Sequence, residues 1–233
     1  MGRFDTDRLE MIALMKERGI IDERVLDAIS RVERHLFVPE PFTSRAYEDS
    51  ALPIGKGQTI SQPYTVAFMT EALEVKEGDK ILEVGTGSGY QSAYLANLTD
   101  KIWSIEIIKP VAERTRSIYD VLVSQGYAEF KSINTKSADG YYGWEDAAPF
   151  DNIIVTCGID HVPPPLLQQL KPGGVMVIPV GPPGAQRVLK IAKLQGADGS
   201  ITTTREDIYG GKIVPFVPFT KLEGDQIVGT HNR

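Results

Sequence analysis

The stretch Lys80–Tyr90, KILEVGTGSGY, constrains the fold more than any other part of the chain. An apolar run in it breaks into three glycines at alternate positions, and helix-compatible residues 91–97 follow, which predicts a strand, a tight turn and a helix. Glycines permit positive φ and let a ligand approach the backbone, and the helix offers unpaired N–H groups at its start. In an open α/β sheet, ligands bind at such a turn. The apolar residues are Ile81, Leu82 and Val84, and the glycines are Gly85, Gly87 and Gly89.

The sequence after this turn alternates between strand and helix patterns. Four β/α alternations predict a mostly parallel, doubly wound α/β sheet with helices on both faces. Residues 186–194 and 201–207 flank a turn and predict an antiparallel hairpin at one edge, and residues 213–219 predict an edge or irregular strand because prolines interrupt them. The other expected strands are 101–106, 130–134, 150–156 and 175–180, and the helices are 63–74, 109–125 and 165–170.

The chain length of 233 residues suits one domain with a small appendage. We expect residues 1–48, with amphipathic helices over 5–19 and 22–33, to form an N-terminal helical appendage that packs on the core. Residues 49–64 form a polar loop, and residues 65–233 form the α/β core. The whole chain, 1–233, is then a single domain.

The charge and the cysteine count exclude several classes of function. The net charge of −6 argues against a nucleic-acid partner, which needs a basic face. No apolar run approaches the ~20 residues of a membrane span, and the start of the chain has no apolar signal segment. The single cysteine, Cys157, suits a reducing cytoplasm. With His35, His161 and His231 it makes no metal-ligand pattern, so no metal is expected.

Three acids select the ligand of the glycine turn. Glu83 lies on the first strand, Glu106 ends the second and Asp139 follows the third, so we expect them in one crevice. A dinucleotide site needs G-x-G-x-x-G, and Tyr90 stands where its last glycine would be. No P-loop sequence is present either. S-adenosylmethionine has no phosphate and carries a sulfonium, an ammonium and a ribose diol, which suit carboxylates. We expect Glu106 to bind the ribose hydroxyls and Asp139 the adenine amino group.

The pattern E-x-G-x-G-x-G, followed by an acid at the end of the next strand, resembles the class I S-adenosylmethionine-dependent methyltransferases, whose fold is Rossmann-like. Enzymes of this class that methylate nitrogen commonly carry an Asn/Asp-Pro-Pro-aromatic motif after the fourth strand. Residues 156–165 contain prolines there but no aromatic residue after them. An amino acceptor is therefore less favoured.

Residues 49–64, DSALPIGKGQTISQPY, closely resemble the protein-L-isoaspartate O-methyltransferases. The run Gly57–Pro63 is highly specific, whereas the glycine turn is typical only of the class. The resemblance extends from residue 20 to residue 220. It continues through Asp139-Gly140-Tyr141, Gly143-Trp144, Ala148-Pro149-Phe150-Asp151 and Gln169–Gly174.

The resemblance implies a repair enzyme that methylates the α-carboxylate of L-isoaspartyl residues in damaged proteins and peptides. The ester then cyclises to a succinimide, and hydrolysis returns some normal aspartate. It also implies a monomer, a catalytic Ser61 that touches the substrate carboxylate, and a substrate site that includes Thr156 and Val217. The cofactor residues implied are Gln58, Thr59, Ile60, Glu83, Gly85, Thr86, Gly87, Ser88, Gly89, Glu106, Asp139, Gly140 and Thr220.

A carboxylate acceptor needs no general base, because its reference pKa of ~4 leaves it ionised near neutral pH. Alignment of oxygen, methyl and sulfur remains, and positioning can lower a barrier by up to ~7–11 kcal/mol. Ser61 would donate a hydrogen bond to one carboxylate oxygen, and backbone N–H groups could hold the other. Helix capping is the alternative role for Ser61.

Two departures from the family pattern bear on the acceptor. Ala138 replaces the usual glycine before Asp139, and residues 157–161 replace a run that is usually alanine-rich. A methyltransferase for another carboxylic acid is therefore a second hypothesis. A non-enzymatic adaptor is a third, and the retention of Ser61 and Glu106 argues against it.

Overall fold

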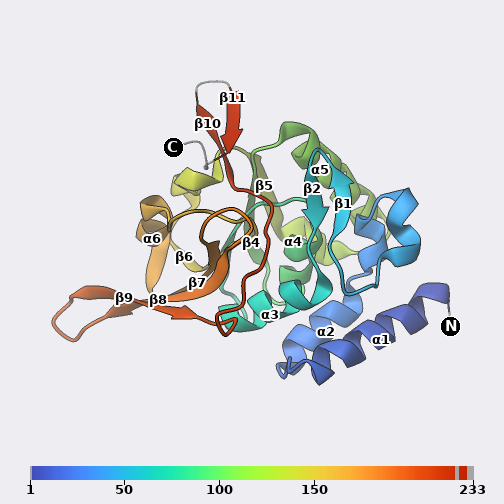
Figure 1. The fold of residues 1–233 in the computed structure, drawn as a ribbon, viewed down its shortest axis with the longest axis horizontal. Helices are drawn as coiled ribbons and strands as arrows, with labels where there is room; N and C mark the ends of the chain where they lie inside the picture. The colour runs from blue at the N-terminus through green and yellow to red at the C-terminus, as the bar shows by residue number, and fades with distance from the viewer. Residues whose placement is uncertain (1, 224–225, 230–233) are drawn as a thin grey trace.

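The computed structural model describes residues 2–223 and 226–229, so His231 lies outside the described residues. Seven strands form the central sheet in the order β5-β4-β3-β6-β7-β8-β9 (Figure 1). The five strands β5, β4, β3, β6 and β7 run parallel. Strand β8 pairs antiparallel with β7, and β9 pairs antiparallel with β8. The expected mostly parallel α/β fold with antiparallel C-terminal strands is confirmed. The strands are β3 (Lys80–Val84), β4 (Lys101–Glu106), β5 (Ile133–Ser137), β6 (Phe150–Val155), β7 (Leu170–Val180), β8 (Arg187–Gln195) and β9 (Ile201–Asp207).

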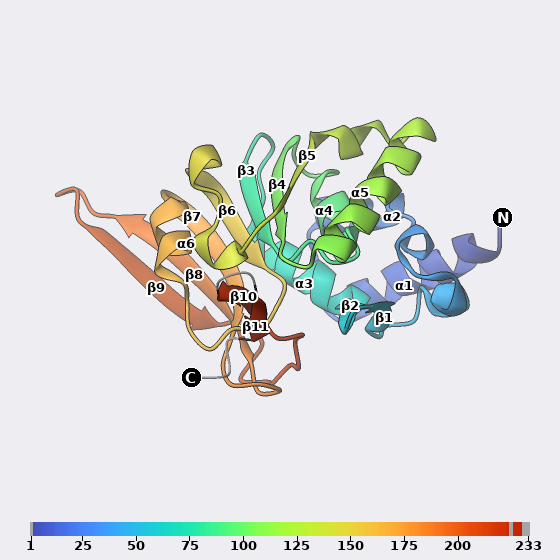
Figure 2. The ribbon, with the colours of Figure 1, turned by 90° about the horizontal axis from the view of Figure 1, so that it is seen from above.

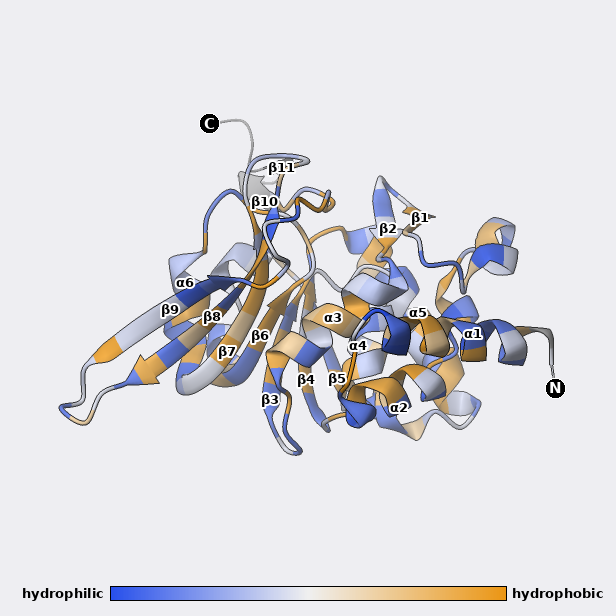
Figure 3. Ribbon diagram, turned by 60° about the horizontal axis from the view of Figure 1, so that its bottom comes forward, coloured by the Kyte–Doolittle hydropathy of each residue, from blue (hydrophilic) through white to orange (hydrophobic). Residues whose placement is uncertain are grey.

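The sheet is buried on both faces. Successive side chains of a strand point to opposite faces, and in β3 Ile81 joins one hydrophobic cluster whereas Leu82 joins the other. Val177 and Ile178 divide between the clusters in the same way. The central strands are accordingly mostly apolar, whereas β9 is largely hydrophilic (Figure 3).

Helices on both sides complete the layers. The first cluster lies under α3 (Pro63–Leu73), α4 (Tyr90–Leu95) and α5 (Lys109–Ser124), and the second under α6 (Pro164–Gln169). Proline is the first residue of α3 and α6 and the second of α5, positions where its missing N–H leaves no hydrogen bond unmade. Viewed from above, the β8–β9 ladder and the N-terminal helices lie at opposite ends of the molecule (Figure 2).

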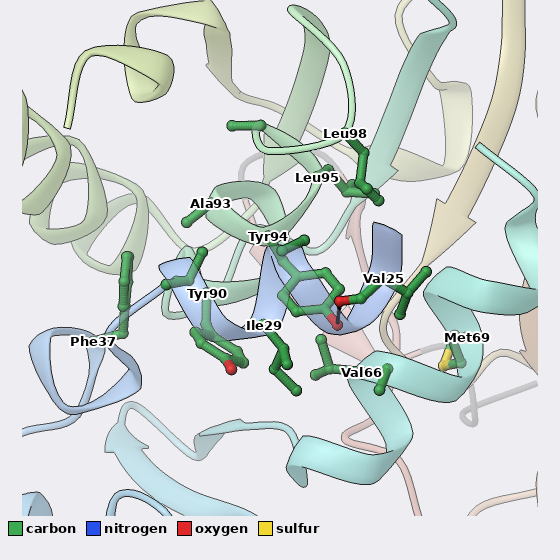
Figure 4. Packing of buried hydrophobic residues seen from close by; sticks show 14 of the residues in the cluster. Val25, Ile29, Phe37, Val66, Met69, Tyr90, Ala93, Tyr94, Leu95 and Leu98 are labelled. Carbon is green, nitrogen blue, oxygen red and sulfur yellow. Dashed lines mark hydrogen bonds between the residues drawn. The ribbon is translucent and has the colours of Figure 1, made fainter. Parts of the chain in front are cut away.

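The N-terminal helices pack directly on the α/β core. They are α1 (Arg3–Glu17) and α2 (Glu23–Arg31), and two 3-10 turns follow, η1 (Arg34–Phe37) and η2 (Glu40–Arg45). The Tyr94 ring of α4 points toward α2, and its hydroxyl donates to the Val25 carbonyl at 2.6 Å (Figure 4). Met15 and Ile29 belong to the same buried cluster as residues of the sheet.

The third parallel strand begins later than the sequence indicates. Phe130, expected in the strand, lies in the 3-10 turn η3 (Ala128–Ser132) and stacks on Tyr127 with 5.5 Å between ring centroids. The expected range 130–134 is therefore wrong, and Ile133 starts β5 by pairing with Ile102. This edge strand is largely polar, so hydrophobic periodicity gives no signal for it.

The polar loop contains an unexpected hairpin. Strand β1 (Leu52–Gly55) pairs antiparallel with β2 (Gln58–Ile60), and Leu52 and Ile60 are buried. Residues 213–219, which we call the strap, form only isolated bridges, because Pro215 and Pro218 cannot donate to a ladder. A second unexpected hairpin follows, β10 (Thr220–Glu223) with β11 (Gln226–Gly229).

This topology fixes where a ligand can bind. The chain passes from β3 to β4 on one side, and β6 later pairs with β3 on the other, so β3 is the point at which the strand order reverses. The glycine turn leaves the carboxyl end of β3 at this point, where open α/β sheets bind ligands. None of the helices within the described ranges is long and apolar enough to cross a membrane.

Candidate active site

A cleft of about 720 Å³, counting its open mouth, lies at the carboxyl end of β3. Segments distant in sequence line it: the glycine turn, the end of β2 with Ser61, the end of β4, Gly140 after β5, the end of β6, and the end of the strap.

The glycine turn is shaped for close contacts that side chains would block. Gly85 has φ +100°, and a Cβ there would lie 2.4 Å from Thr156 Oγ1. Gly87 has φ +53°, and the position of its absent Cβ lies 4.0 Å from the Thr59 carbonyl oxygen of the polar loop. The turn and the polar loop therefore face each other across the cleft, with backbone exposed to a ligand.

Glu106 stiffens the turn and lines the cleft. Its Oε2 accepts from the Gly87 N–H and its Oε1 from the Ile108 N–H, both at 2.9 Å. Burial raises the pKa of Glu106, although the backbone donors oppose that shift. A carboxylate has more acceptor sites than these two bonds use, so Glu106 can also accept hydrogen bonds from ligand hydroxyl groups.

Glu83 does not line the cleft, contrary to expectation. Its side chain points to the same face of the sheet as Ile81, beneath α4, and is fully buried. Oε2 accepts hydrogen bonds from Ser104 Oγ at 2.5 Å and from Ser92 Oγ, while Oε1 has no partner among the described residues. Burial raises the pKa of Glu83 to about 7.

The two residues after β5 divide between the cleft and the turn beneath it. Gly140 lines the cleft, but Asp139 Oδ1 accepts from the Tyr141 N–H at 2.9 Å and caps the turn η4 (Gly140–Tyr142). Gly89, also expected at the cofactor, lies against α5, where its carbonyl accepts from the Tyr119 hydroxyl at 2.9 Å. Neither Asp139 nor Gly89 is among the lining residues.

Ser61 directly follows β2 and lines the cleft. The next residue, Gln62, is the N-cap of α3, but its side chain makes no capping bond. The cap comes from Asp49, whose carboxylate accepts a hydrogen bond from the Tyr64 N–H in the first turn. Within residues 2–223 no hydrogen bond engages the Ser61 hydroxyl. The capping role is therefore filled by another residue, and the hydroxyl is free to meet a ligand.

The end of the strap lines the cleft and is held there by backbone hydrogen bonds to Gly158. The Val217 carbonyl accepts from the Gly158 N–H at 2.9 Å, and the Phe219 N–H donates to the Gly158 carbonyl at 2.8 Å. The Phe216 N–H donates to the buried side chain of Gln186 at 3.3 Å. The Val217 N–H has no acceptor among the described residues.

The floor between these walls comes from the end of β6. Thr156 lines the cleft, but its hydroxyl donates to the Gly85 carbonyl at 2.7 Å. Cys157 is half-buried beside it, and burial raises the pKa of its thiol. Thr156 thus fixes the glycine turn, and Cys157 presents an un-ionised, small side chain.

The cleft brings together most residues predicted from the sequence: Gln58, Thr59, Ile60, Ser61, Gly85, Thr86, Gly87, Ser88, Glu106, Gly140, Thr156, Val217 and Thr220. The prediction missed an apolar part of the lining: Val66, Val84, Tyr90, Ile105, Ile107 and Ile108. The pair Ile107-Ile108, directly after the acid that ends β4, is the one signal in the sequence that could have indicated an apolar wall there.

The polar and apolar groups that line the cleft fit S-adenosylmethionine. Glu106 suits a diol, exposed backbone of the glycine turn suits close contact, and Ile107 and Ile108 offer an apolar surface to a base. The lining includes no lysine or arginine that would favour a phosphate. The arrangement can bind a cofactor and hold an acceptor at Ser61, and no lining residue is a histidine that could act as a base.

A family model described as Protein-L-isoaspartate(D-aspartate) O-methyltransferase matches residues 6–224. A protein-L-isoaspartate O-methyltransferase of Anaeromyxobacter dehalogenans is 48% identical over 213 residues, covering 91% of this chain and 97% of that protein. Protein-L-isoaspartate O-methyltransferase 1 of Nitrosospira multiformis is 50% identical over 200 residues, covering 86% and 78%. A Plasmodium falciparum structure, described as a beta-aspartate methyltransferase in complex with S-adenosyl-L-homocysteine, superposes with a TM-score of 0.73 at 24% identity, covering 91% and 98%, and shares the fold.

Proposed function

Since the chain belongs to the protein-L-isoaspartate(D-aspartate) O-methyltransferase family, it is an S-adenosylmethionine-dependent methyltransferase of L-isoaspartyl residues, and we propose how its cleft divides this work. The cofactor, when bound, supplies an electrophilic methyl group on its sulfonium. The acceptor is the α-carboxylate of an isoaspartyl residue in a protein or peptide, and methylation initiates its repair.

The cofactor side of the cleft consists of the glycine turn, Glu106 and the end of β2. We propose that Glu106 binds the ribose hydroxyls, because its carboxylate lines the cleft while two backbone donors fix its orientation. Residues 85–88 and 58–60 would contact the cofactor through their backbone, and Gly140 and Thr220 would border it. Asp139 would act by shaping the turn at Gly140, since its carboxylate caps that turn.

The acceptor side is proposed to consist of Ser61 and Val217. Ser61 Oγ and the Val217 N–H are both hydrogen-bond donors at the cleft without an acceptor among the described residues. Two donors match the two oxygens of a carboxylate, which is ionised at neutral pH and needs no base. Holding the acceptor in line lowers the barrier through orientation rather than proton transfer. The unengaged Ser61 hydroxyl is the observation that carries this proposal.

The test is methyl transfer by Ser61→Ala to an isoaspartyl peptide and to the same peptide with normal aspartate. We expect turnover of the isoaspartyl peptide to fall by ~10- to ~100-fold, because a misplaced acceptor costs that much. The affinity for S-adenosyl-L-homocysteine, measured by calorimetry, should stay within about twofold since a hydroxyl on the acceptor side is removed. Unchanged turnover would remove Ser61 from the mechanism, and equal transfer to both peptides would contradict isoaspartyl selectivity.

We also propose that residues 1–233 act as one domain, as a monomer, in the cytoplasm and without nucleic acid. The cluster that joins Met15 and Ile29 to residues of the sheet supports one domain. The net charge of −6 disfavours binding to a polyanion. Sedimentation of the full chain with and without duplex DNA tests the monomer and the absence of binding together.

A further inference from the structure

The carboxylate of Asp49 joins the two ends of the polar loop that carries Ser61. Its Oδ1 accepts from the Tyr64 N–H at 3.0 Å, and its Oδ2 accepts from Gln62 Nε2 at 2.9 Å. Ser61 therefore lies next to one residue that Asp49 holds and three positions before another. The loop is closed at its base by a single side chain.

Asp49 also caps α3 from 15 residues upstream of Tyr64. The helix begins at Pro63, which has no N–H, and the N-cap residue Gln62 makes no capping bond with its own side chain. Tyr64 is the first residue of α3 with an N–H to satisfy, and a carboxylate at this end is favourable toward the helix dipole. Asp49 therefore supplies the cap of α3, and the Ser61 hydroxyl, which lines the cleft, takes no part in it.

Arg18, at the end of α1, holds Asp49 from the other side. Its guanidinium forms an ion pair with Asp49 Oδ2 and lies 3.6 Å from the centre of the Tyr64 ring. The side chains of Asp49 and Arg18 are only 14% and 35% exposed, so solvent screens this pair less than an open surface pair. The N-terminal helices thereby reach the base of the loop.

The part of the loop assigned to the cofactor has a separate anchor. Arg114 of α5 donates to the Ile54 carbonyl of β1 at 2.7 Å, and β1 pairs with β2. The hairpin therefore has an anchor that does not involve Asp49. Loss of the Asp49 contacts should displace Ser61 more than residues 58–60.

We propose that Asp49, supported by Arg18, is a positioning residue that sets the place of the Ser61 hydroxyl in methyl transfer. This rests on the proposed role of Ser61. Asp49 does not touch the reacting atoms; it fixes Gln62 and Tyr64 on the carboxyl side of Ser61 and caps the helix that begins there.

The experiment compares Asp49→Asn, Ser61→Ala and the double variant in the full chain. Asn keeps the size of Asp49 and an acceptor for the Tyr64 N–H, but it loses the charge that pairs with Arg18. We expect Asp49→Asn to lower kcat on the isoaspartyl peptide by about tenfold, with the affinity for S-adenosyl-L-homocysteine within about twofold. The control is Glu48→Gln, at the residue that directly precedes Asp49. It removes an exposed ion pair with Arg45 and should leave kcat unchanged.

The double variant separates positioning from a structural contribution. If Asp49 acts through Ser61, Asp49→Asn adds no further loss of kcat in the Ser61→Ala background, whereas independent effects would multiply. A full further tenfold loss there, or an Asp49→Asn enzyme as active as the Glu48→Gln control, overturns the proposal. Ser61→Ala with normal turnover would instead refute the proposed function itself. If Asp49→Asn does not fold, Arg18→Met in both backgrounds gives the same comparison, because it removes the partner of Asp49 and keeps an apolar stem over Tyr64.

Discussion

The buried carboxyl of Glu83 predicts a pH dependence of stability that one substitution should abolish. Glu83 lies under α4, with one oxygen bonded by Ser92 and Ser104 and the other without a partner among the described residues. Burial raises its pKa from 4.5 to about 7, against the opposing effect of the serine hydroxyls. Glu83→Gln keeps the shape and one acceptor oxygen but cannot ionise.

The sign follows from proton binding. Between pH 4.5 and about 7 the folded protein holds the Glu83 proton more tightly than the unfolded chain, so the free energy of unfolding falls as pH rises. A pKa difference of this size corresponds to about 3 kcal/mol in total, at 1.36 kcal/mol per unit. Stabilisation by the neutral carboxyl is complete below pH 4.5 and is lost as pH rises through 7. Most of the change, about 2–3 kcal/mol, falls between pH 5 and pH 8.

The assay is urea unfolding of the wild-type protein and Glu83→Gln at pH 5, 6, 7 and 8. We expect the unfolding free energy of the variant minus that of the wild type to increase by about 2–3 kcal/mol from pH 5 to pH 8. Any constant cost of the amide cancels, because only the change with pH is compared. Glu77→Gln, at an exposed acid just before β3, controls for removing a charge. Parallel curves for wild type and Glu83→Gln would refute the reasoning.

Three further outcomes can be measured. Gly85→Ala should weaken S-adenosyl-L-homocysteine binding by ~10-fold or more, since its Cβ would meet Thr156 Oγ1 at 2.4 Å and φ is +100°; unchanged calorimetric affinity would contradict this. Gln169→Leu should lower the unfolding free energy by ~1–3 kcal/mol, because its side chain accepts from the Trp144 N–H and donates to the Tyr142 carbonyl, both at 2.8 Å; Gln168→Leu, at a side chain without such bonds in the described residues, is the control. Cys157 should react slowly with iodoacetamide in the native state, because burial raises the pKa of its thiol. The reaction should be slower still with S-adenosyl-L-homocysteine bound. A rate equal to that of the unfolded chain would be evidence against the position of Cys157 in the cleft.

Local sequence patterns were sufficient where hydrophobic periodicity and turn residues agree. The strand 101–106 and the helix ends near Pro63 and Lys109 were predicted within a residue, because burial period and proline position coincide there. The polar edge strand β5 and the hairpin β10–β11 were not, because an edge strand need not carry an apolar face.

The sequence also contained information about Glu83 that its motif obscured. Residues of a strand alternate between the faces of the sheet, so Glu83 must point with Ile81 toward the helices over that face. Its place in the glycine motif suggested contact with the ligand, but the pleat of β3 directs its carboxyl to the face of the sheet under α4, away from the cleft lining. Glu106 differs because it ends its strand, where the chain is free to turn toward the cleft.

The sequence by itself determined the fold class, and it predicted the glycine turn as the ligand site and Ser61 as the residue that meets the substrate, because these depend on local order along the chain. Only the tertiary structure decided which hydroxyls remain free: the Thr156 hydroxyl bonds the glycine turn, and Asp49 rather than Ser61 caps α3. It also brought the strap to the cleft, more than 150 positions after Ser61. Hydrogen-bond partners of this kind come from segments far apart in sequence, and no local pattern specifies them.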